Sequence, residues 1–82
     1  MAVEIVSFKF APPGLSIKAG STVTWTNQDE EPHTVFFADD GTKSPTLGNQ
    51  GSTFSHTFTK PGTFSYNCTI HPFMHGTLTV TP

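Results

Sequence analysis

The 82-residue sequence contains no arginine, and its four lysines are outnumbered by six acidic residues, for a net charge of −2. A protein that binds the phosphate backbone of DNA or RNA needs a basic stripe, and none is present, so we expect no nucleic-acid partner. No apolar run approaches the length of a transmembrane helix, so we expect no membrane span in this chain. No charged segment followed by an apolar one opens the sequence, so no export signal is recognised.

Cysteine is nearly absent as well. Cys68 is the only one, and a single cysteine cannot form an internal disulfide. A chain of this length is near the lower limit for one self-sufficient hydrophobic core, and small domains often gain stability from disulfides or a metal ion. With the disulfide excluded, a metal is the remaining candidate.

The residues that are abundant favour β-structure throughout. Eight phenylalanines and many Thr, Val and Ser suit pleated, half-buried surfaces, and glycine and proline fall between the runs. The pattern predicts strands over 3–10, 15–19, 21–27, 32–37, 52–58, 63–68 and 76–81, with one long irregular segment at 38–51. We therefore predict a single domain over residues 1–82, an all-β sandwich or barrel of about seven to eight strands.

Ligand-type side chains gather near the C-terminus in "CTIHPFMH", which starts at Cys68. Cys68, His71 and Met74 follow the spacing Cys-x2-His-x2-Met. Cys68 ends one predicted strand, His71 and Met74 lie in the predicted loop at 69–75, and His33 lies at the start of a predicted strand far upstream. Two histidines, a cysteine and a weak axial methionine are the ligand set of a blue-copper electron-transfer centre. Thiolate and thioether favour Cu(I) and imidazoles favour Cu(II), so the mixed set stabilises both states.

Each of these residues also has an ordinary structural explanation. Cys68 alone reads as a small buried apolar residue, Met74 as core filling and His33 as a histidine at a strand edge. The shared spacing makes metal ligation the preferred interpretation for Cys68 and Met74. For His33 the same interpretation rests on the preceding Pro32 and on the family resemblance given next.

Three segments resemble the cupredoxins, the type 1 blue copper proteins. "YNCTIHPFMHG" is similar to the short ligand loop of the amicyanin and plastocyanin branch, "EPHTVFF" to its upstream histidine segment, and "FTKPGTFSYNC" to its approach to the cysteine. The resemblance implies a Greek-key β-sandwich that holds one copper ion. It implies His33, Cys68 and His71 as equatorial ligands and Met74 as the axial ligand.

Two positions depart from the family pattern. Ile70 stands where proline is usual, and unlike proline it retains an amide hydrogen, so we predict an N–H···S bond from Ile70 to the Cys68 sulfur. Such a bond should raise the reduction potential. A second N–H···S bond, from the Thr34 amide, is implied by the resemblance, and Thr34 itself stands where asparagine is frequent.

The remaining polar groups receive milder interpretations. His56 alternates in phase with phenylalanines and is expected to be a partly buried sheet histidine, and His75 is expected to point away from the metal. Five acidic residues are expected on solvated loop faces, although they are also candidates for docking a basic partner: Asp29, Glu30, Glu31, Asp39 and Asp40.

A transient redox partner is expected to dock on an apolar patch around His71, Pro72 and Phe73. If the fold is that of the family, Pro45 and Pro12 or Pro13 would lie nearby.

The function implied is a small, monomeric electron carrier that shuttles one electron by Cu(II)/Cu(I) cycling and is not an enzyme. The alternatives are a copper delivery or storage module, a domain cut from a larger copper protein, an oxidase or reductase domain, and a zinc site. Two methionines are few for a storage protein, and only His56 and His75 remain for a second copper. The family resemblance implies a periplasmic or other extracytoplasmic location.

Overall fold

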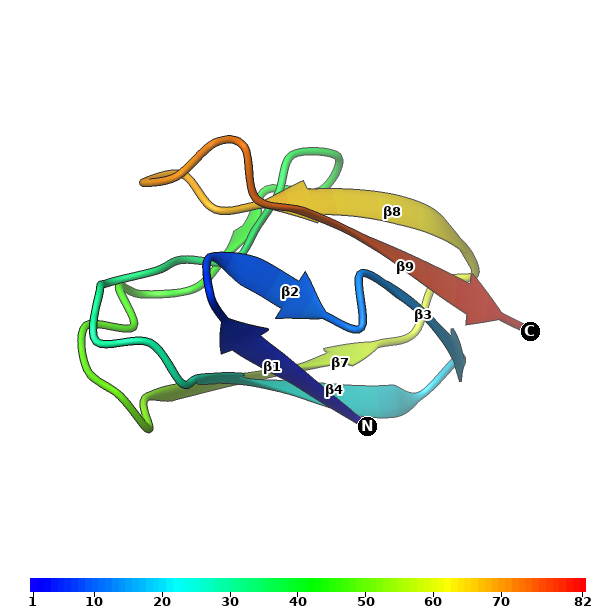
Figure 1. Ribbon diagram of the computed structural model, residues 1–82. Helices are drawn as coiled ribbons and strands as arrows, with labels where there is room; N and C mark the ends of the chain where they lie inside the picture. Colours follow the sequence, from blue (N-terminus) through cyan, green and yellow to red (C-terminus); the bar gives the residue numbers. More distant parts are fainter.

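The computed structural model describes residues 1–82 and contains two β-sheets packed face to face (Figure 1). Nine strands are present: β1 (Ala2–Val6), β2 (Lys9–Ala11), β3 (Gly14–Lys18), β4 (Ser21–Asn27), β5 (Phe36–Phe37), β6 (Thr42–Lys43), β7 (Thr53–Phe58), β8 (Gly62–Asn67) and β9 (His75–Thr81). One sheet has the order β2-β1-β4-β7 and the other β3-β9-β8-β5-β6. There is no helix of the length and apolarity that crossing a membrane demands.

The core lies between the sheets because alternate residues of each strand face inward. In β4 the side chains of Val23 and Trp25 are fully buried, and in β9 those of Leu78 and Val80 are nearly so. Trp25 lies at the centre of an aromatic cluster, with rings at 5–7 Å and mostly tilted or edge-to-face: Phe37, Phe54, Phe58 and Tyr66. The predicted all-β sandwich is confirmed.

Two of the predicted strands are wrong in detail. The segment 3–10 is a hairpin, since β1 and β2 are joined by the two-residue turn Ser7–Phe8 and Val6 pairs with Lys9. Most of 32–37 is irregular, and only Phe36–Phe37 forms a strand. His33 instead forms an isolated β-bridge with Leu47, which fixes the backbone of His33.

The other predicted strands are confirmed to within one residue at each end. The segment 38–51, predicted to be irregular, contains the two-residue strand β6 paired with β5. The ligand loop covers residues 68–74 rather than 69–75, because β9 already begins at His75.

Four connections lie at the same end of the sandwich, on the left in Figure 1. They are the β1–β2 turn, the segment 28–35 after β4, the segment 44–52 before β7 and the loop 68–74 between β8 and β9. The C-terminus lies at the opposite end, since β9 runs away from this loop end. The candidate ligands thus lie on loops held by rigid strands.

Gly76 in β9 pairs with Tyr66 in β8, and a Cβ atom at this position would collide with the Tyr66 ring. We predict that Gly76→Ala lowers the free energy of unfolding by about 1–3 kcal/mol, the usual cost of forcing extra atoms into a packed site. Denaturant unfolding would measure it. Gly14→Ala is the matched control, because a Cβ on Gly14 meets no atom within 4 Å. Equal stability of the two variants would contradict this account.

Candidate metal centre

The segment that carries His33 is held on both sides by backbone hydrogen bonds. His33 and Leu47 exchange N–H···O bonds of 3.1 and 2.8 Å, and the Ser44 amide donates to the Val35 carbonyl at 2.8 Å. The buried side-chain amide of Asn27 donates to the Leu47 carbonyl at 2.9 Å. An irregular segment is therefore fixed as firmly as a strand, and His33 is completely buried within it.

The loop that carries the other candidate ligands starts where β8 ends. Phe36 of β5 pairs with Asn67, so that the chain just before Phe36 lies beside Cys68. The Met74 amide donates to the His71 carbonyl at 2.9 Å, and the Cys68 amide donates to the Met74 carbonyl at 3.2 Å. These two bonds close the loop tightly and turn its side chains toward one centre.

Three donor atoms converge at this centre. The Cys68 Sγ atom lies 3.9 Å from the Nδ1 atoms of both His33 and His71, and the two Nδ1 atoms are 3.2 Å apart. The point equidistant from the three atoms lies about 2.1 Å from each, and transition-metal bonds to nitrogen and sulfur in proteins run from about 2.0 to 2.3 Å. The residues present therefore fit a first-row metal ion without rearrangement.

The sulfur of Cys68 accepts two backbone hydrogen bonds, each with an N···S distance of 3.4 Å. The donors are the amides of Thr34 and His71. The prediction that Ile70 supplies the second bond is wrong: the loop turns so that the next amide points at the sulfur, and the side chain of Ile70 is 43% exposed. The two N–H donors hold the sulfur in place beside the two imidazoles.

Thr34 ties its segment to the ligand loop through its hydroxyl. The Thr34 Oγ1 atom accepts a hydrogen bond from the Thr69 amide at 2.8 Å and lies 2.8 Å from the Thr69 hydroxyl. The Thr34 amide meanwhile donates to the sulfur. Thr34 therefore fastens together the two segments that carry the candidate ligands.

Asp29 is an acidic residue that the sequence analysis placed on a solvated face, and this is wrong. Its side chain is only 12% exposed, and its Oδ2 atom lies 2.9 Å from the Nε2 atom of His33. Burial raises the pKa of Asp29, but the amides of Phe8 and Ser7 and the His33 ring lower it by more, so that this pKa lies below its ordinary value of 3.8. The ionised carboxylate accepts the Nε2 hydrogen of His33, which leaves the lone pair of Nδ1 facing the centre.

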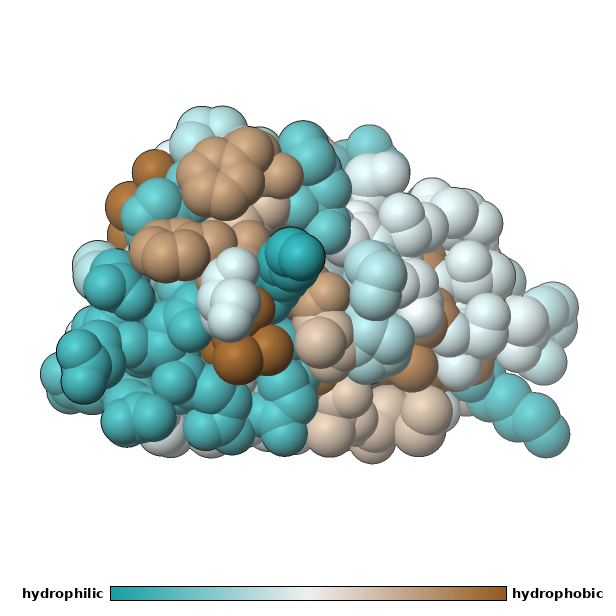
Figure 2. All heavy atoms as spheres, in the orientation of Figure 1, coloured by the Kyte–Doolittle hydropathy of each residue, from teal (hydrophilic) through white to brown (hydrophobic).

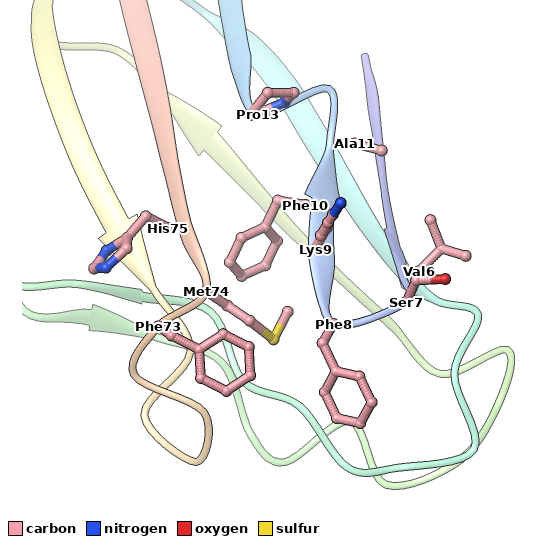
Figure 3. Close-up of a pocket in the computed structure, with 10 residues that line it drawn as sticks. All are labelled: Val6, Ser7, Phe8, Lys9, Phe10, Ala11, Pro13, Phe73, Met74 and His75. Atoms are coloured by element: carbon pink, nitrogen blue, oxygen red, sulfur yellow. The ribbon is translucent and has the colours of Figure 1, made fainter.

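Met74 belongs to the same loop and is nearly fully buried. It lines an apolar hollow of about 560 Å³ between the loop and the β1–β2 hairpin, together with Phe8, Phe10 and Phe73 (Figure 3). In this view the sulfur of Met74 points into the space between the Phe8 and Phe73 rings.

Phe8 is a residue near the centre that the sequence analysis missed. Its ring lies edge-on to both His33 and His71, with centroids at 5.4 and 5.0 Å. A signal was available, because the inward-facing positions change from odd numbers (Val3, Ile5) to even ones (Phe8, Phe10), and such a change of phase marks a turn.

The two remaining histidines do not join the centre. His56 lies half-buried on β7, with its ring 6.3 Å from that of Phe54 and 4.7 Å from that of Phe58, as expected for a sheet histidine. His75 is exposed, and Figure 3 shows its side chain directed away from Met74 and Phe8.

The chain is similar to known copper-binding proteins. A family model described as "Copper binding proteins, plastocyanin/azurin family" matches residues 1–81. The chain belongs to this family. Copper is thus confirmed as its cofactor and the cupredoxin resemblance is confirmed.

Amicyanins are among the similar proteins. The chain is 39% identical to amicyanin from Paracoccus denitrificans, with 98% of the chain and 64% of the relative covered. It is 43% identical to amicyanin-alpha from Methylorubrum extorquens, with 95% and 69% covered. The chain thus spans about two thirds of the length of these curated relatives.

Plastocyanins and solved structures agree with this placement. Plastocyanin from Scenedesmus fuscus is 36% identical over 87% of the chain and 85% of the relative. The solved structure of an amicyanin mutant in its Cu(I) form has a TM-score of 0.92 at 39% identity, with 98% of this chain and 80% of that one covered.

We predict that Asp29→Asn weakens metal binding by about 10- to 100-fold, the usual effect of losing the hydrogen-bond partner of a ligand histidine. The amide cannot accept all three hydrogen bonds that the carboxylate receives, so the free energy of unfolding should also fall by about 1–3 kcal/mol. Competitive titration with a chelator and denaturant unfolding would measure the two effects.

Glu30→Gln is the matched control for this experiment, because it removes the same charge from the exposed neighbour of Asp29. If Asp29→Asn and Glu30→Gln changed the metal affinity equally, the effect would be one of net charge and the role given to the Asp29–His33 contact would be wrong.

Proposed function

We propose that this chain is a blue-copper electron carrier in which His33, Cys68 and His71 are the equatorial ligands and Met74 is the axial ligand. The triangle formed by two Nδ1 atoms and one Sγ atom is the observation that carries the proposal. Copper supplies a one-electron Cu(II)/Cu(I) couple when bound. Since an electron carrier makes and breaks no bonds in a substrate, the protein is not an enzyme.

The chain's own residues account for fast electron transfer by holding the ligand atoms still. His33 is fixed by Asp29 and by the bridge to Leu47, and the Cys68 sulfur is fixed by two amides. A site whose geometry is set before the metal binds changes little between oxidation states, so the reorganisation on electron transfer stays small.

Burial argues against the alternative of a copper delivery or storage module. His33 and Cys68 are fully buried, and only His71 is partly exposed. A protein that hands its metal to a partner needs ligands that the partner can reach. This centre offers the solvent one imidazole edge, which suits the transfer of an electron.

The apolar patch at the loop end supports a docking role. Phe73 is 67% exposed, Pro72 is exposed and Ile70 is 43% exposed beside the partly exposed His71. Figure 2 shows apolar atoms gathered on the upper part of this end of the molecule, above a hydrophilic area. A redox partner protein that docks over Pro72 and Phe73 would meet the copper site through His71.

The remaining parts of the proposal concern the protein's setting. Residues 1–82 form one copper-binding domain that acts as a monomer in a periplasmic or other extracytoplasmic compartment. One shared core, with fifteen buried apolar residues from both sheets and from the connections at the loop end, supports the single domain. The family membership supports the location.

Addition of Cu(II) to the apo protein should produce an intense visible band and a type 1 EPR spectrum, because charge transfer from a cysteine thiolate to Cu(II) absorbs strongly in the visible. We predict that Cys68→Ser abolishes this band, since it removes the thiolate. A colourless wild-type complex would contradict the blue-copper proposal and would favour a zinc or other metal site.

His75→Ala is the control for the colour, because His75 is the neighbour of Met74 and is directed away from it. This variant should remain blue. Loss of the band in His75→Ala would show that the ligand set is wrong.

A charge on the proposed docking patch should slow electron exchange between two copies of the protein. We predict that Phe73→Asp lowers the self-exchange rate, measured by NMR line broadening in mixtures of reduced and oxidised protein, by roughly 10-fold, because like charges would face each other across the contact. The visible spectrum should stay unchanged.

Ala19→Asp is the matched control, since it adds the same charge at an exposed position beside the C-terminus, at the far end of the sandwich. Equal rates for the two variants would exclude Phe73 from the docking surface.

A further inference from the structure

The turn between β1 and β2 has an unfavourable backbone for its sequence. Ser7 and Phe8 have φ values of 52° and 58°, the left-handed region at both central positions of a two-residue hairpin turn. Such turns usually contain Asn-Gly or Asp-Gly, because side chains disfavour this region, and a bulky residue there is a genuine outlier. Strained residues of this kind cluster at functional sites, and they persist where the surrounding structure fixes them.

The carboxylate of Asp29 fixes this turn. Its Oδ1 atom accepts a hydrogen bond from the Ser7 amide at 2.8 Å, and its Oδ2 atom accepts one from the Phe8 amide at 3.0 Å. The same Oδ2 atom lies 2.9 Å from Nε2 of His33. One side chain therefore joins the strained turn to a proposed copper ligand, although the turn and His33 are far apart in the sequence.

The result of this arrangement is the position of the Phe8 ring. It stands at 83° to the His33 ring and at 79° to the His71 ring, so that one aromatic side chain contacts both imidazoles. It also lies 6.4 Å from the exposed Phe73 ring. Figure 3 shows Phe8 at the tip of the hairpin, with the Met74 sulfur between its ring and that of Phe73.

We propose that Phe8 is a positioning residue for the copper site: the Asp29-fixed turn holds its ring against His33 and His71 and so keeps both imidazoles in the binding orientation. This inference rests on the proposed ligand set and adds a further residue to it. His71 is the partly exposed ligand on a short loop, and its ring contacts the Phe8 ring at 5.0 Å and the Phe73 ring at 6.0 Å. Of these two neighbours, Phe73 is itself 67% exposed, so Phe8 is the more firmly held support.

A variant of the turn separates this role from a contribution to the fold. The double variant Ser7→Asn/Phe8→Gly introduces the residues that this turn conformation favours. It keeps both backbone amides that donate hydrogen bonds to Asp29. The hairpin should become no less stable, while the support of the imidazole rings is lost. A merely structural role would require stability and the copper site to change together.

We expect the metal-free double variant to have a midpoint of thermal unfolding close to the wild-type value, because relief of the unfavourable turn conformation offsets the loss of the half-buried Phe8 ring. Its copper affinity should fall about tenfold, the equivalent of about 1.4 kcal/mol. In the metal-free protein, NMR relaxation should show a more mobile His71 ring, and in the copper form the EPR spectrum and the reduction potential should shift.

Ser7→Asn alone is the matched control, because it favours the same turn and retains the Phe8 ring. It should leave the affinity, the His71 relaxation and the potential at their wild-type values. Phe8→Leu keeps the apolar volume and tests the need for an aromatic ring, and it should show an intermediate effect.

Wild-type affinity, ring mobility and potential in the double variant would overturn the proposal. So would a parallel loss of these properties and of thermal stability. Failure of the proposed function has a different signature, since the wild-type protein would then form no visible band with Cu(II). The relaxation of the His71 ring in the metal-free protein tests the role of Phe8 in that case too.

Discussion

The contact between the Thr34 segment and the Cys68 sulfur is the interaction on which the site depends. The pairing of Phe36 with Asn67 brings β5 beside β8. Next to this pair, the Thr34 amide donates a hydrogen bond to the Cys68 sulfur, with an N···S distance of 3.4 Å. The Thr34 hydroxyl then accepts the Thr69 amide. Without this junction His33 would have no fixed relation to the loop that carries Cys68 and His71, and the three donor atoms would not share a centre.

The polar groups around the centre form a chain in which each one is satisfied by the next. The Asn27 side-chain oxygen accepts a hydrogen bond from the Asp29 amide at 2.8 Å. The Asp29 carboxylate accepts hydrogen bonds from the two turn amides and contacts His33. The Asn27 side-chain amide donates to the carbonyl of Leu47, which pairs with His33. Asn27 is completely buried, which is costly for an amide unless its hydrogen bonds are made. Since the network joins the β1–β2 turn, the segment 28–35 and the segment 44–52, it fixes the relative positions of these three connections before any metal is present.

Much of this architecture was predictable from the sequence because it depends on local patterns. The alternation of apolar residues predicted the strands at 21–27, 52–58 and 76–81, and the spacing of Cys68, His71 and Met74 identified the loop. The upstream His33 was identified because its segment, "EPHTVFF", resembles that of the cupredoxins. These features are encoded by neighbouring residues, and the structure needs little more than strand pairing to bring them together.

The features that the sequence did not reveal depend on contacts between distant segments. Asp29 looks like one of several loop acids, and only the fold shows that it meets Ser7, Phe8 and His33. Similarly, Ile70 and His71 both carry amides, and the path of the loop decides that the His71 amide reaches the sulfur. A hydrogen bond to sulfur depends on atomic direction, which the order of residue types does not specify.

The backbone strain in the molecule lies at the metal end. The strands pair regularly and tolerate their own sequences, whereas the two non-glycine residues with positive φ both lie in the turn at the metal end. A turn with Asn-Gly would suffice to join β1 to β2, so the connection itself does not require a phenylalanine. What the phenylalanine adds is a ring between the hairpin and the two imidazoles. The hairpin thereby becomes part of the wall of the site, and the sandwich supports His71, the proposed ligand that solvent can reach.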